Sequence, residues 1–554
     1  MREAPPQTTG VGPAGRNPRR WWILLVLILA LFGVSVDNTI LIIALPTLAR
    51  DLQASAADLQ WMVDSYILVF AGFLLLSGAL ADRYGRRRML VIGLILFGVG
   101  SVFAPFVTSA DELIALRAFM GLGASLMMPA TLSIIADVFD SEERPKAIAA
   151  WGSISAIGIV AGPILGGWLL DHFAWPSVFL VNVPFAIVGV IATLAVVPES
   201  RAPGRVSLDL VGAALSVVGL VSLVYAIIEI PSRGWDDPSV LAAFGVALAT
   251  LGAFVVWERR TPAPMLDVGL FRDQGFAAAC LSVTLVFFAL NGALFFLTQY
   301  MQGVQGLDAL ATGFRFIPVA VGVMLGAGIS ASAVRRLGAR VVTSAGLALM
   351  AVGLLAFALI QVDSGDTFIA LLLFVCSSGI GLAMTPATDA IMGALPPDQF
   401  GVGSAVNDTT REVGGALGVA LLGSLFAAAY ADRLRPQLPD GIPADIATLI
   451  TDSLAGALAV AEQAGGALGQ ALVTTAQQAF VEALALTTVV GAVIAFGGVL
   501  VAVIWMPRRP SDHAQAVPLA ASAGPVVSLP GDHGGSEHGS RGTGRDTQPD
   551  GSLQ

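Results

Sequence analysis

Long apolar runs separated by short polar segments make up most of this chain. Fourteen of the runs are close to the roughly 20 residues that a helix needs to cross about 30 Å of hydrocarbon. The pattern therefore predicts an all-α polytopic membrane protein. The predicted spans are residues 22–45, 59–81, 88–107, 112–136, 146–170, 178–197, 208–230, 239–257, 276–300, 312–334, 340–361, 367–391, 406–430 and 483–506.

Two parts of this pattern leave room for another interpretation. The thirteenth run opens with the polar stretch 407–412, which is unusual for a membrane helix. The seventh and eighth runs could form a re-entrant pair instead of two full spans. An even number of spans would place both ends of the chain on the same side of the membrane.

Three segments differ from the short loops that join most spans. Residues 1–20 and 507–554 are rich in Pro, Gly and polar residues, and both are predicted to be disordered. The segment 431–482 is rich in Ala and Leu with polar residues at helical spacing, which indicates an amphipathic helix on the outer face.

Composition and charge agree with a membrane protein and give it an orientation. Hydrophobic residues make up 56% of the chain and charged residues 12%, against about 25% charged residues in soluble domains. Most of the 29 Arg and Lys residues fall in the leader, the tail and alternate loops. Because cytoplasmic loops carry the basic excess, both termini are predicted to be cytoplasmic.

A faint internal repeat indicates two similar halves. The loop at 78–90 reads GALADRYGRRRML, and the loop at 332–340 shares its basic pair, a Gly and a further Arg. Transporters built from repeated helix bundles show such weak symmetry. We therefore predict six-helix bundles at 21–197 and 261–506, the second including the outer loop at 431–482, with two inserted helices at 198–260.

The loop at 78–90 also carries a family resemblance. It resembles the cytoplasmic loop motif of the major facilitator superfamily, and the matching residues are Gly78, Asp82, Arg83, Gly85, Arg86 and Arg87. The resemblance implies a role in gating. Gly78 would permit close helix approach, Asp82 would pair with an Arg or a helix N-terminus, and Arg86 to Arg88 would hold the loop at the anionic inner leaflet. A plain topology signal would explain the Arg cluster but not Asp82 or the glycines.

Residues 152–167 are similar to the antiporter motif of drug exporters in that superfamily. The residues concerned are Gly152, Gly158, Gly162, Pro163, Gly166 and Gly167. Glycines at spacing four lie on one helix face, where another backbone can approach closely, and a proline kinks the helix. Generic glycine packing in membrane helices is the alternative explanation.

Fourteen spans, the opening DNTILIIALP and the segment WPSVFLVNVPF at 175–185 resemble the fourteen-helix drug:proton antiporters of the superfamily. The chain departs from them at Ile42 and Met120, where Asn and Gln are usual. The resemblance implies a monomeric exporter in the bacterial inner membrane, moving lipophilic, cationic drugs or antibiotics against protons by alternating access, without a cofactor, nucleic acid or catalytic activity.

Charges inside membrane spans are expensive and are therefore candidates for function. Asp37 lies roughly 13 Å from the outer end of its span, and Asp64 and Arg117 each lie about 8 Å in. Desolvation favours the neutral form of such a carboxyl group and a nearby Arg favours the charged form, so these residues are candidates for proton coupling. Arg117 also resembles the span-four Arg tied to proton transfer in the family. Asp37 could instead be a structural polar residue, and Asp64 an ordinary hydrated one.

The second bundle supplies three secondary candidates, Asp389, Arg411 and Glu412. Asp389 is close to the cytoplasmic end of span twelve, and the other two lie near the start of span thirteen. They could pair with one another across a loop and serve only as a cytoplasmic gate or anchor, or Glu412 could take a direct part in proton transfer. Glu229 ends span seven and is interpreted as an interfacial charge.

Other functions fit less well. A phosphate-binding P-loop needs a Lys before Ser or Thr, and the sole Lys, Lys146, precedes Ala147, which excludes a Walker-type ATPase within this chain. No metal is predicted, because the spacing typical of metal ligands is absent from the two cysteines, Cys280 and Cys376, and from the three tail histidines, His513, His533 and His538. A narrower transporter for one metabolite, lipid or siderophore remains the alternative.

Overall fold

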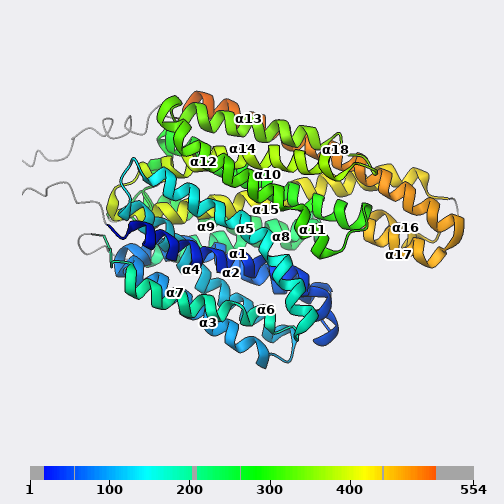
Figure 1. Cartoon of the computed structure of the whole chain (residues 1–554), viewed down its shortest axis with the longest axis horizontal. Helices are drawn as coiled ribbons and strands as arrows, with labels where there is room; N and C mark the ends of the chain where they lie inside the picture. The colour runs from blue at the N-terminus through cyan, green and yellow to red at the C-terminus, as the bar shows by residue number, and fades with distance from the viewer. Residues whose placement is uncertain (1–17, 55, 203–208, 263, 440–441, 507–554) are drawn as a thin grey trace, which may run out of the picture. The chain divides into compact units, whose positions relative to one another are not determined.

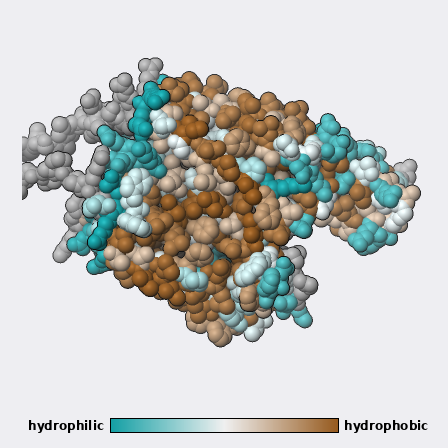
Figure 2. Space-filling view, viewed as in Figure 1, coloured by the Kyte–Doolittle hydropathy of each residue, from teal (hydrophilic) through white to brown (hydrophobic). Residues whose placement is uncertain are grey.

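The computed structural model describes residues 18–54, 56–202, 209–262, 264–439 and 442–506. Within those ranges fourteen helices are long and apolar enough to cross a membrane, which confirms the predicted number of spans. Helices suit hydrocarbon because each satisfies its own backbone hydrogen bonds without water. Figure 2 shows the resulting surface, with apolar residues across the middle of the helices and polar residues gathered at their two ends.

The first bundle contains the first six spans. Its helices are α1 (Arg20–Asp51), α2 (Ala56–Tyr84), α3 (Arg86–Phe103, followed by the short η1, Ala104–Phe106), α4 (Ala110–Val138), α5 (Arg144–His172), α6 (Ser177–Leu180) and α7 (Asn182–Val196). α1 packs against α5 and α7, while α4 packs against both α2 and α3. The sixth span is divided at Val181, so that Asn182 is the first residue of α7.

Two inserted helices follow, α8 (Leu210–Arg233) and α9 (Pro238–Glu258). Both are long enough to span a membrane and they pack against each other, so they do not form a re-entrant pair. Asp237 caps α9 by accepting a hydrogen bond from the Ser239 amide at 2.8 Å. The hydrogen bonds from the Ser239 side chain and amide hold the pKa of Asp237 below its ordinary value.

The second bundle contains the remaining six spans. Its helices are η2 (Val268–Arg272), α10 (Gln274–Gln299), the π turn η3 (Tyr300–Val304), α11 (Ala309–Arg315), α12 (Ile317–Leu337), α13 (Ala339–Phe357), α14 (Asp366–Gly393), η4 (Pro397–Gln399), α15 (Phe400–Leu434) and α18 (Gly466–Trp505). The two bundles meet where α5 contacts α12 and α14, and where α2 contacts α15.

Two boundaries differ from the sequence pattern. α15 begins at Phe400, so the polar stretch 407–412 lies inside a continuous helix. Thr410 Oγ1 donates to the Asn407 carbonyl oxygen at 2.7 Å, whereas Asp408 Oδ2 and Thr409 Oγ1 are buried without a hydrogen-bond partner among the described residues. Residues 431–482 contain the end of α15, the short turn η5 (Arg435–Gln437), the helices α16 (Ala444–Asp452) and α17 (Leu454–Ala464), and the first turns of α18. The fourteenth helix is longer than the apolar run because its polar start at 466–482 still follows helical spacing.

The two ends of the helices are distinguishable in Figure 1. α1 begins and α18 finishes at one end, which we call the terminal end. α16 and α17 lie at the opposite end, which we call the hairpin end. The positions of charged residues below are given relative to these two ends.

Candidate functional site: buried charges, a cavity and a latch

Asp37 and Arg117 form a buried ion pair in the middle of the first bundle. Arg117 Nη1 on α4 donates to Asp37 Oδ2 on α1 at 2.6 Å. The exposed fractions are 0% for Asp37 and 1% for Arg117. In such surroundings each charge depends on the other, because an isolated buried charge is strongly disfavoured. The structure thus brings together two of the three predicted proton-coupling residues.

Three further groups complete the surroundings of this pair. Asn182 Nδ2 on α7 donates to Asp37 Oδ1 at 2.7 Å, and Arg117 Nε donates to the Met62 carbonyl oxygen at 3.1 Å. The Arg117 guanidinium also lies 4.3 Å from the centre of the Tyr66 ring, a distance suited to a cation–π contact. Four helices therefore hold one carboxylate and one guanidinium in a fixed geometry.

Asp64, the third predicted residue, lies in different surroundings. Met62 and Tyr66, which contact Arg117, are each two residues away from Asp64, and such residues point to roughly opposite sides of a helix. Asp64 instead lines a cavity of about 460 Å³ between α2, α8, α10 and α15. Glu412 on α15 lines the same cavity, together with Gln60, Asn291 and Phe295. Two carboxylates from different bundles thus face one space.

Asp82 joins the two bundles near the terminal end. Its Oδ1 accepts a hydrogen bond from the Gly401 amide at 2.8 Å, and its Oδ2 accepts one from the Val402 amide at 3.0 Å. These amides belong to the first turn of α15, where the helix dipole favours a negative charge. A Cβ on Gly78 would lie 2.4 Å from the Gly401 carbonyl oxygen, so this glycine allows α2 and α15 to cross closely.

Arg86 corrects the prediction for the basic cluster. It was expected at the inner leaflet, but it is 1% exposed and its Nη2 donates to Asp82 Oδ1 at 2.9 Å and to the Pro397 carbonyl oxygen at 2.6 Å. It lies inside the protein because it balances the buried charge of Asp82. Arg88 is the exposed member, at 66% for its side chain.

The neighbouring motif residues shape the turn between α2 and α3. Gly85 has a φ of 114°, which favours glycine. A Cβ on Gly85 would lie 2.4 Å from Glu199 Oε1, and Glu199 also lies 3.7 Å from Arg87 Nε. Arg83 contacts the Tyr84 ring. The segment that follows α7 therefore packs onto this turn.

Three glycines of α5 form the contact surface for α1. A Cβ on Gly158 would lie 2.4 Å from the Ser35 Cβ, one on Gly162 would lie 1.9 Å from Thr39 Oγ1, and one on Gly166 would lie 2.9 Å from the Ile40 Cγ1. Thr39 Oγ1 also donates to the Gly158 carbonyl oxygen at 3.1 Å. These contacts flank Asp37, so the glycine spacing fixes the position of the helix that carries it.

The other motif residues of α5 face the second bundle. Gly152 lies next to Met384 of α14, and Gly167 lies next to Leu310 of α11. A Cβ on Gly313 of α11 would lie 2.9 Å from the Pro163 Cβ. One helix thus carries the packing of α1 on one side and contacts between the bundles on the other.

The predicted mutual pairing of Asp389, Arg411 and Glu412 is wrong. Asp389 Oδ1 accepts a hydrogen bond from Arg144 Nε of α5 at 2.6 Å, which joins the two bundles. Arg411 Nη1 lies 3.5 Å from Asp408 Oδ1, three residues away on the same helix. Glu412 faces the cavity. Helical spacing separates Arg411 from Glu412, since consecutive positions point about 100° apart, and Asp389 lies on a different helix, α14.

Arg411 is also held by aromatic rings from both bundles. Its guanidinium lies 5.1 Å from the centre of the Trp151 ring on α5 and 4.5 Å from that of the Phe287 ring on α10. Trp151 is 0% exposed and its Nε1 donates to Thr131 Oγ1 at 3.1 Å. The second buried Asp–Arg pair therefore depends on contacts across the bundle interface.

Sequence reasoning missed Asn182, Trp151 and Asp408 as partners of the buried charges. Asp408 and Arg411 had a usable signal, because opposite charges at spacing three share a helix face. Asn182 lay in a segment noted only for family resemblance, and nothing in its local pattern points to Asp37, 145 residues away.

Glu229 pairs with Arg233 at the end of α8 and is 5% exposed, so it is a buried charge and not the interfacial one that the sequence predicted. Among the described residues there is no group of three or more His, Cys, Asp or Glu that could hold a metal ion. His513, His533 and His538 lie outside them. Cys280 and Cys376 are buried and free.

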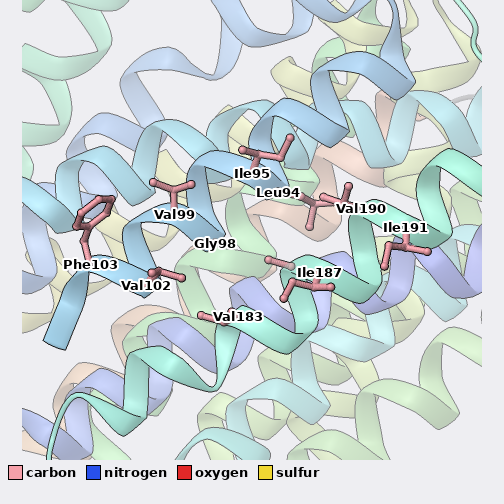
Figure 3. Close-up of a pocket in the computed structure, with 11 residues that line it drawn as sticks. Leu94, Ile95, Gly98, Val99, Val102, Phe103, Val183, Ile187, Val190 and Ile191 are labelled. Carbon is pink, nitrogen blue, oxygen red and sulfur yellow. The ribbon is translucent and has the colours of Figure 1, made fainter.

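A second cavity, of about 380 Å³, lies between α3 and α7 (Figure 3). Its lining is apolar throughout, from Leu94, Ile95 and Val99 on α3 to Ile187 and Ile191 on α7. It offers no hydrogen-bonding side chain, so it has no chemistry comparable with that of the Asp64–Glu412 cavity.

Comparison with known proteins places this geometry in a family. The model of the Major Facilitator Superfamily matches residues 27–419. A multidrug efflux pump of Mycolicibacterium smegmatis, LfrA, is 36% identical over 89% of this chain and 96% of its own length. The multidrug resistance protein Stp of Mycobacterium tuberculosis is 36% identical over 75% of this chain and 77% of its own length.

Solved structures agree on the fold. The human organic anion transporter MFSD10 has a TM-score of 0.57 at 16% identity, covering 86% of this chain and the whole of that protein. A bacterial homologue of the human lysosomal transporter Spinster has a TM-score of 0.53 at 18% identity, covering 88% and 98% of the two chains. With two six-helix bundles, two inserted helices and a match over most of its length, this chain belongs to the major facilitator superfamily of membrane transporters.

Proposed function

We propose that this chain is a proton-coupled exporter of lipophilic, cationic compounds, including drugs or antibiotics, that works by alternating access in the bacterial cytoplasmic membrane. Relatives with names of this kind support the proposal: besides the two multidrug proteins, a tetracenomycin C resistance and export protein of Streptomyces glaucescens is 29% identical over 92% of this chain. Transport is common to the family. The direction of transport, its coupling to protons and the cationic nature of the cargo are the claims to be tested.

The observation that carries the proposal is the separation of two acidic places. Asp64 and Glu412 face a cavity whose other walls are largely apolar, which suits a cation attached to an apolar body. Asp37 lies apart from that cavity, fully buried and paired with Arg117. One place can bind cargo while the other exchanges a proton.

In this division of roles Asp37 carries the proton. Protonation of its carboxylate would weaken the ion pair with Arg117, and Arg117 would then rely on the Met62 carbonyl oxygen and the Tyr66 ring. The pair is therefore a two-state element whose geometry responds to a proton. Asp64, at the hairpin end of α2, would attract the cationic group of the cargo.

Alternating access would require the contacts between bundles to break near the terminal end. They are the hydrogen bonds that Asp82 accepts from the first turn of α15, the hydrogen bond that Arg86 donates to the Pro397 carbonyl oxygen, and the Arg144–Asp389 pair. We assign gating to the motif that contains Gly78, Asp82 and Gly85, and bundle packing to the α5 glycines. The terminal end would face the cytoplasm, and the protein would act as a monomer with the predicted domain boundaries.

The alternative, a transporter for a single metabolite, lipid or siderophore, was suggested by the departures at Ile42 and Met120. Ile42 is 53% exposed, and Met120 is buried against Gly100 of α3. Neither residue is among those that line the Asp64–Glu412 cavity. The departures therefore give little support to a change of cargo.

The experiment is efflux of ethidium, a lipophilic cationic dye, from cells expressing the protein, with and without an uncoupler. We expect export by the native protein to stop with the uncoupler and Asp37→Asn to abolish export.

Glu412→Gln should reduce efflux of cations more than that of neutral lipophiles. Asp111→Asn, which removes an exposed carboxylate at the hairpin end, is the matched control. If Asp37→Asn still exports dye in an uncoupler-sensitive way, the role of Asp37 is wrong.

A further inference from the structure

Asn182 is a buried amide with one satisfied and one unsatisfied end. It is 0% exposed, and its Nδ2 donates to Asp37 Oδ1 at 2.7 Å. Its Oδ1 is buried and has no hydrogen-bond partner among the described residues. A buried acceptor without a partner normally costs free energy, so a second use for this oxygen is worth seeking.

The chemistry of the two partners of Asp37 differs. Arg117 has only hydrogen-bond donors, so it stabilises the ionised carboxylate and offers nothing to a carboxylic acid hydrogen. Its Nη1 faces Asp37 Oδ2, so a proton that binds Asp37 without displacing Arg117 must bind Oδ1. That oxygen faces Asn182, whose amide contains both a donor and an acceptor.

We propose that Asn182 is a positioning residue for proton exchange at Asp37. When Asp37 is ionised, Asn182 Nδ2 donates to Oδ1. When a proton binds Oδ1, the amide turns over and Asn182 Oδ1 accepts the new O–H hydrogen. On release the proton leaves Asp37 Oδ1 and the amide turns back. Each orientation leaves one end of the amide without a partner, so the turn costs no additional hydrogen bond.

The surroundings of Asp37 offer no competing side chain for this proton. Among the described residues, the side chains hydrogen-bonded to Asp37 are those of Arg117 and Asn182. α2 contributes Tyr66, whose ring contacts Arg117. Neither α6 nor α7 contains an ionisable residue, and those of α5 lie near its ends. The α5 residues are Arg144, Lys146, Asp171 and His172.

This inference rests on the proposed proton coupling, and its test separates the two. The experiment measures ethidium transport by the full chain in liposomes and the infrared band of the protonated Asp37 carboxyl group, identified by its loss in Asp37→Asn. Asn182→Leu removes both functions of the amide at similar volume. We expect kcat to fall by about tenfold or more with KM for the dye little changed, since one hydrogen bond to a charged group is lost.

Two measurements, the carboxyl band and the pH profile, distinguish a role in proton exchange from a purely structural role of Asn182. In Asn182→Leu the carboxyl band should move to higher wavenumber, because the acid hydrogen has lost its acceptor. The pH profile of transport should also shift by about one unit. Asn182→Ser keeps a group that can donate and accept, so it should recover part of the rate and of the band position. Should Asn182→Leu not fold, Asn182→Ala, which also removes the donor and the acceptor, carries the same comparison of band and pH profile with the native protein.

Thr193→Val is the matched control, since Thr193 is a buried polar residue on the same helix whose Oγ1 has no hydrogen-bond partner among the described residues. It should leave rate, band and pH profile unchanged. An unchanged band and pH profile in the Asn182 variants, with Asp37→Asn inactive, would overturn the role of Asn182 alone. Uncoupler-sensitive transport by Asp37→Asn would instead overturn the proton coupling on which it rests.

Discussion

Besides the Asp82–Arg86 pair, each bundle contains a buried Asp–Arg pair, and these two pairs are held in different ways. Asp37 and Arg117 are 2.6 Å apart and are hydrogen-bonded to groups from α7 and α2 of their own bundle. Asp408 and Arg411 are 3.5 Å apart, and Arg411 relies on rings from α5 and α10. The contacts of the first pair come from its own bundle, whereas those of the second include a ring from across the bundle interface.

Removal of the two arginines should therefore have unequal effects on stability. Arg117→Met leaves the Asp37 carboxylate buried without its cation, which we expect to cost about 3–5 kcal/mol of unfolding free energy. Arg411→Met should cost about 1–2 kcal/mol, because a methionine thioether keeps contact with both rings. Thermal unfolding of the purified variants in detergent measures the difference. Equal losses would mean that the pairs are equivalent.

The Asp37–Arg117 pair also depends on how closely α1, which carries Asp37, packs against α5. Gly162→Ala places a methyl group 1.9 Å from Thr39 Oγ1, so α1 must shift and the Asp37–Arg117 geometry must open. We expect a loss of about 1–3 kcal/mol and a large loss of transport. Gly167→Ala is the matched control on the same helix, since its Cβ would have only Leu310 nearby, at 3.9 Å. Similar effects of both substitutions would contradict this account.

The dependence of Arg411 on the bundle interface can be measured directly. Trp151→Leu should lose about 1 kcal/mol of cation–π attraction, and a double-mutant cycle with Arg411→Met should return a coupling of similar size. Thr131→Val removes the hydrogen bond to Trp151 Nε1 without touching the ring, and should show no coupling to Arg411. Coupling near zero for Trp151 would show that the ring contact contributes nothing.

The smallest effect is expected at Asp408. Its Oδ2 has no hydrogen-bond partner among the described residues, and its contact with Arg411 is long. Asp408→Asn should therefore change the unfolding free energy by less than about 1 kcal/mol. The corresponding Asp37→Asn should cost more, measured in the same unfolding assay. A larger effect at Asp408 would mean that the carboxylate, and not the rings, holds Arg411.

The number of spans was predictable because hydrocarbon requires long apolar helices, and each such helix needs its own continuous run of apolar residues in the sequence. The Asp82 motif also predicted its own partner, since a carboxylate one helical turn from Gly78, where another helix can approach closely, suits a helix N-terminus. Depth alone could not predict that Asp64 lines a cavity whereas Asp37 is paired with Arg117. Depth fixes the position along a helix, whereas partners are set by rotation about the helix axis and by neighbours distant in sequence.

The same limit explains the errors for Arg86 and Asp389. A basic cluster at a span end usually marks a membrane surface, but Arg86 opens α3 directly after the turn at Gly85, and this turn brings it back onto Asp82 at the end of α2. Asp389 pairs with Arg144, 245 residues away, which only the packing of α14 on α5 brings close. Contacts between bundles are the part of this molecule that local patterns do not contain.

α15 is an unbroken helix of 35 residues, about 50 Å long, with no internal proline. Its first turn binds Asp82, and roughly 16 Å further along it presents Glu412 to the cavity. Because the helix is unbroken, a movement of its first turn is carried to the residues further along it. A tilt that frees this first turn from Asp82 would also displace Asp408, Arg411 and Glu412. The shape of the cavity is therefore linked to the hydrogen bonds that Asp82 accepts from Gly401 and Val402.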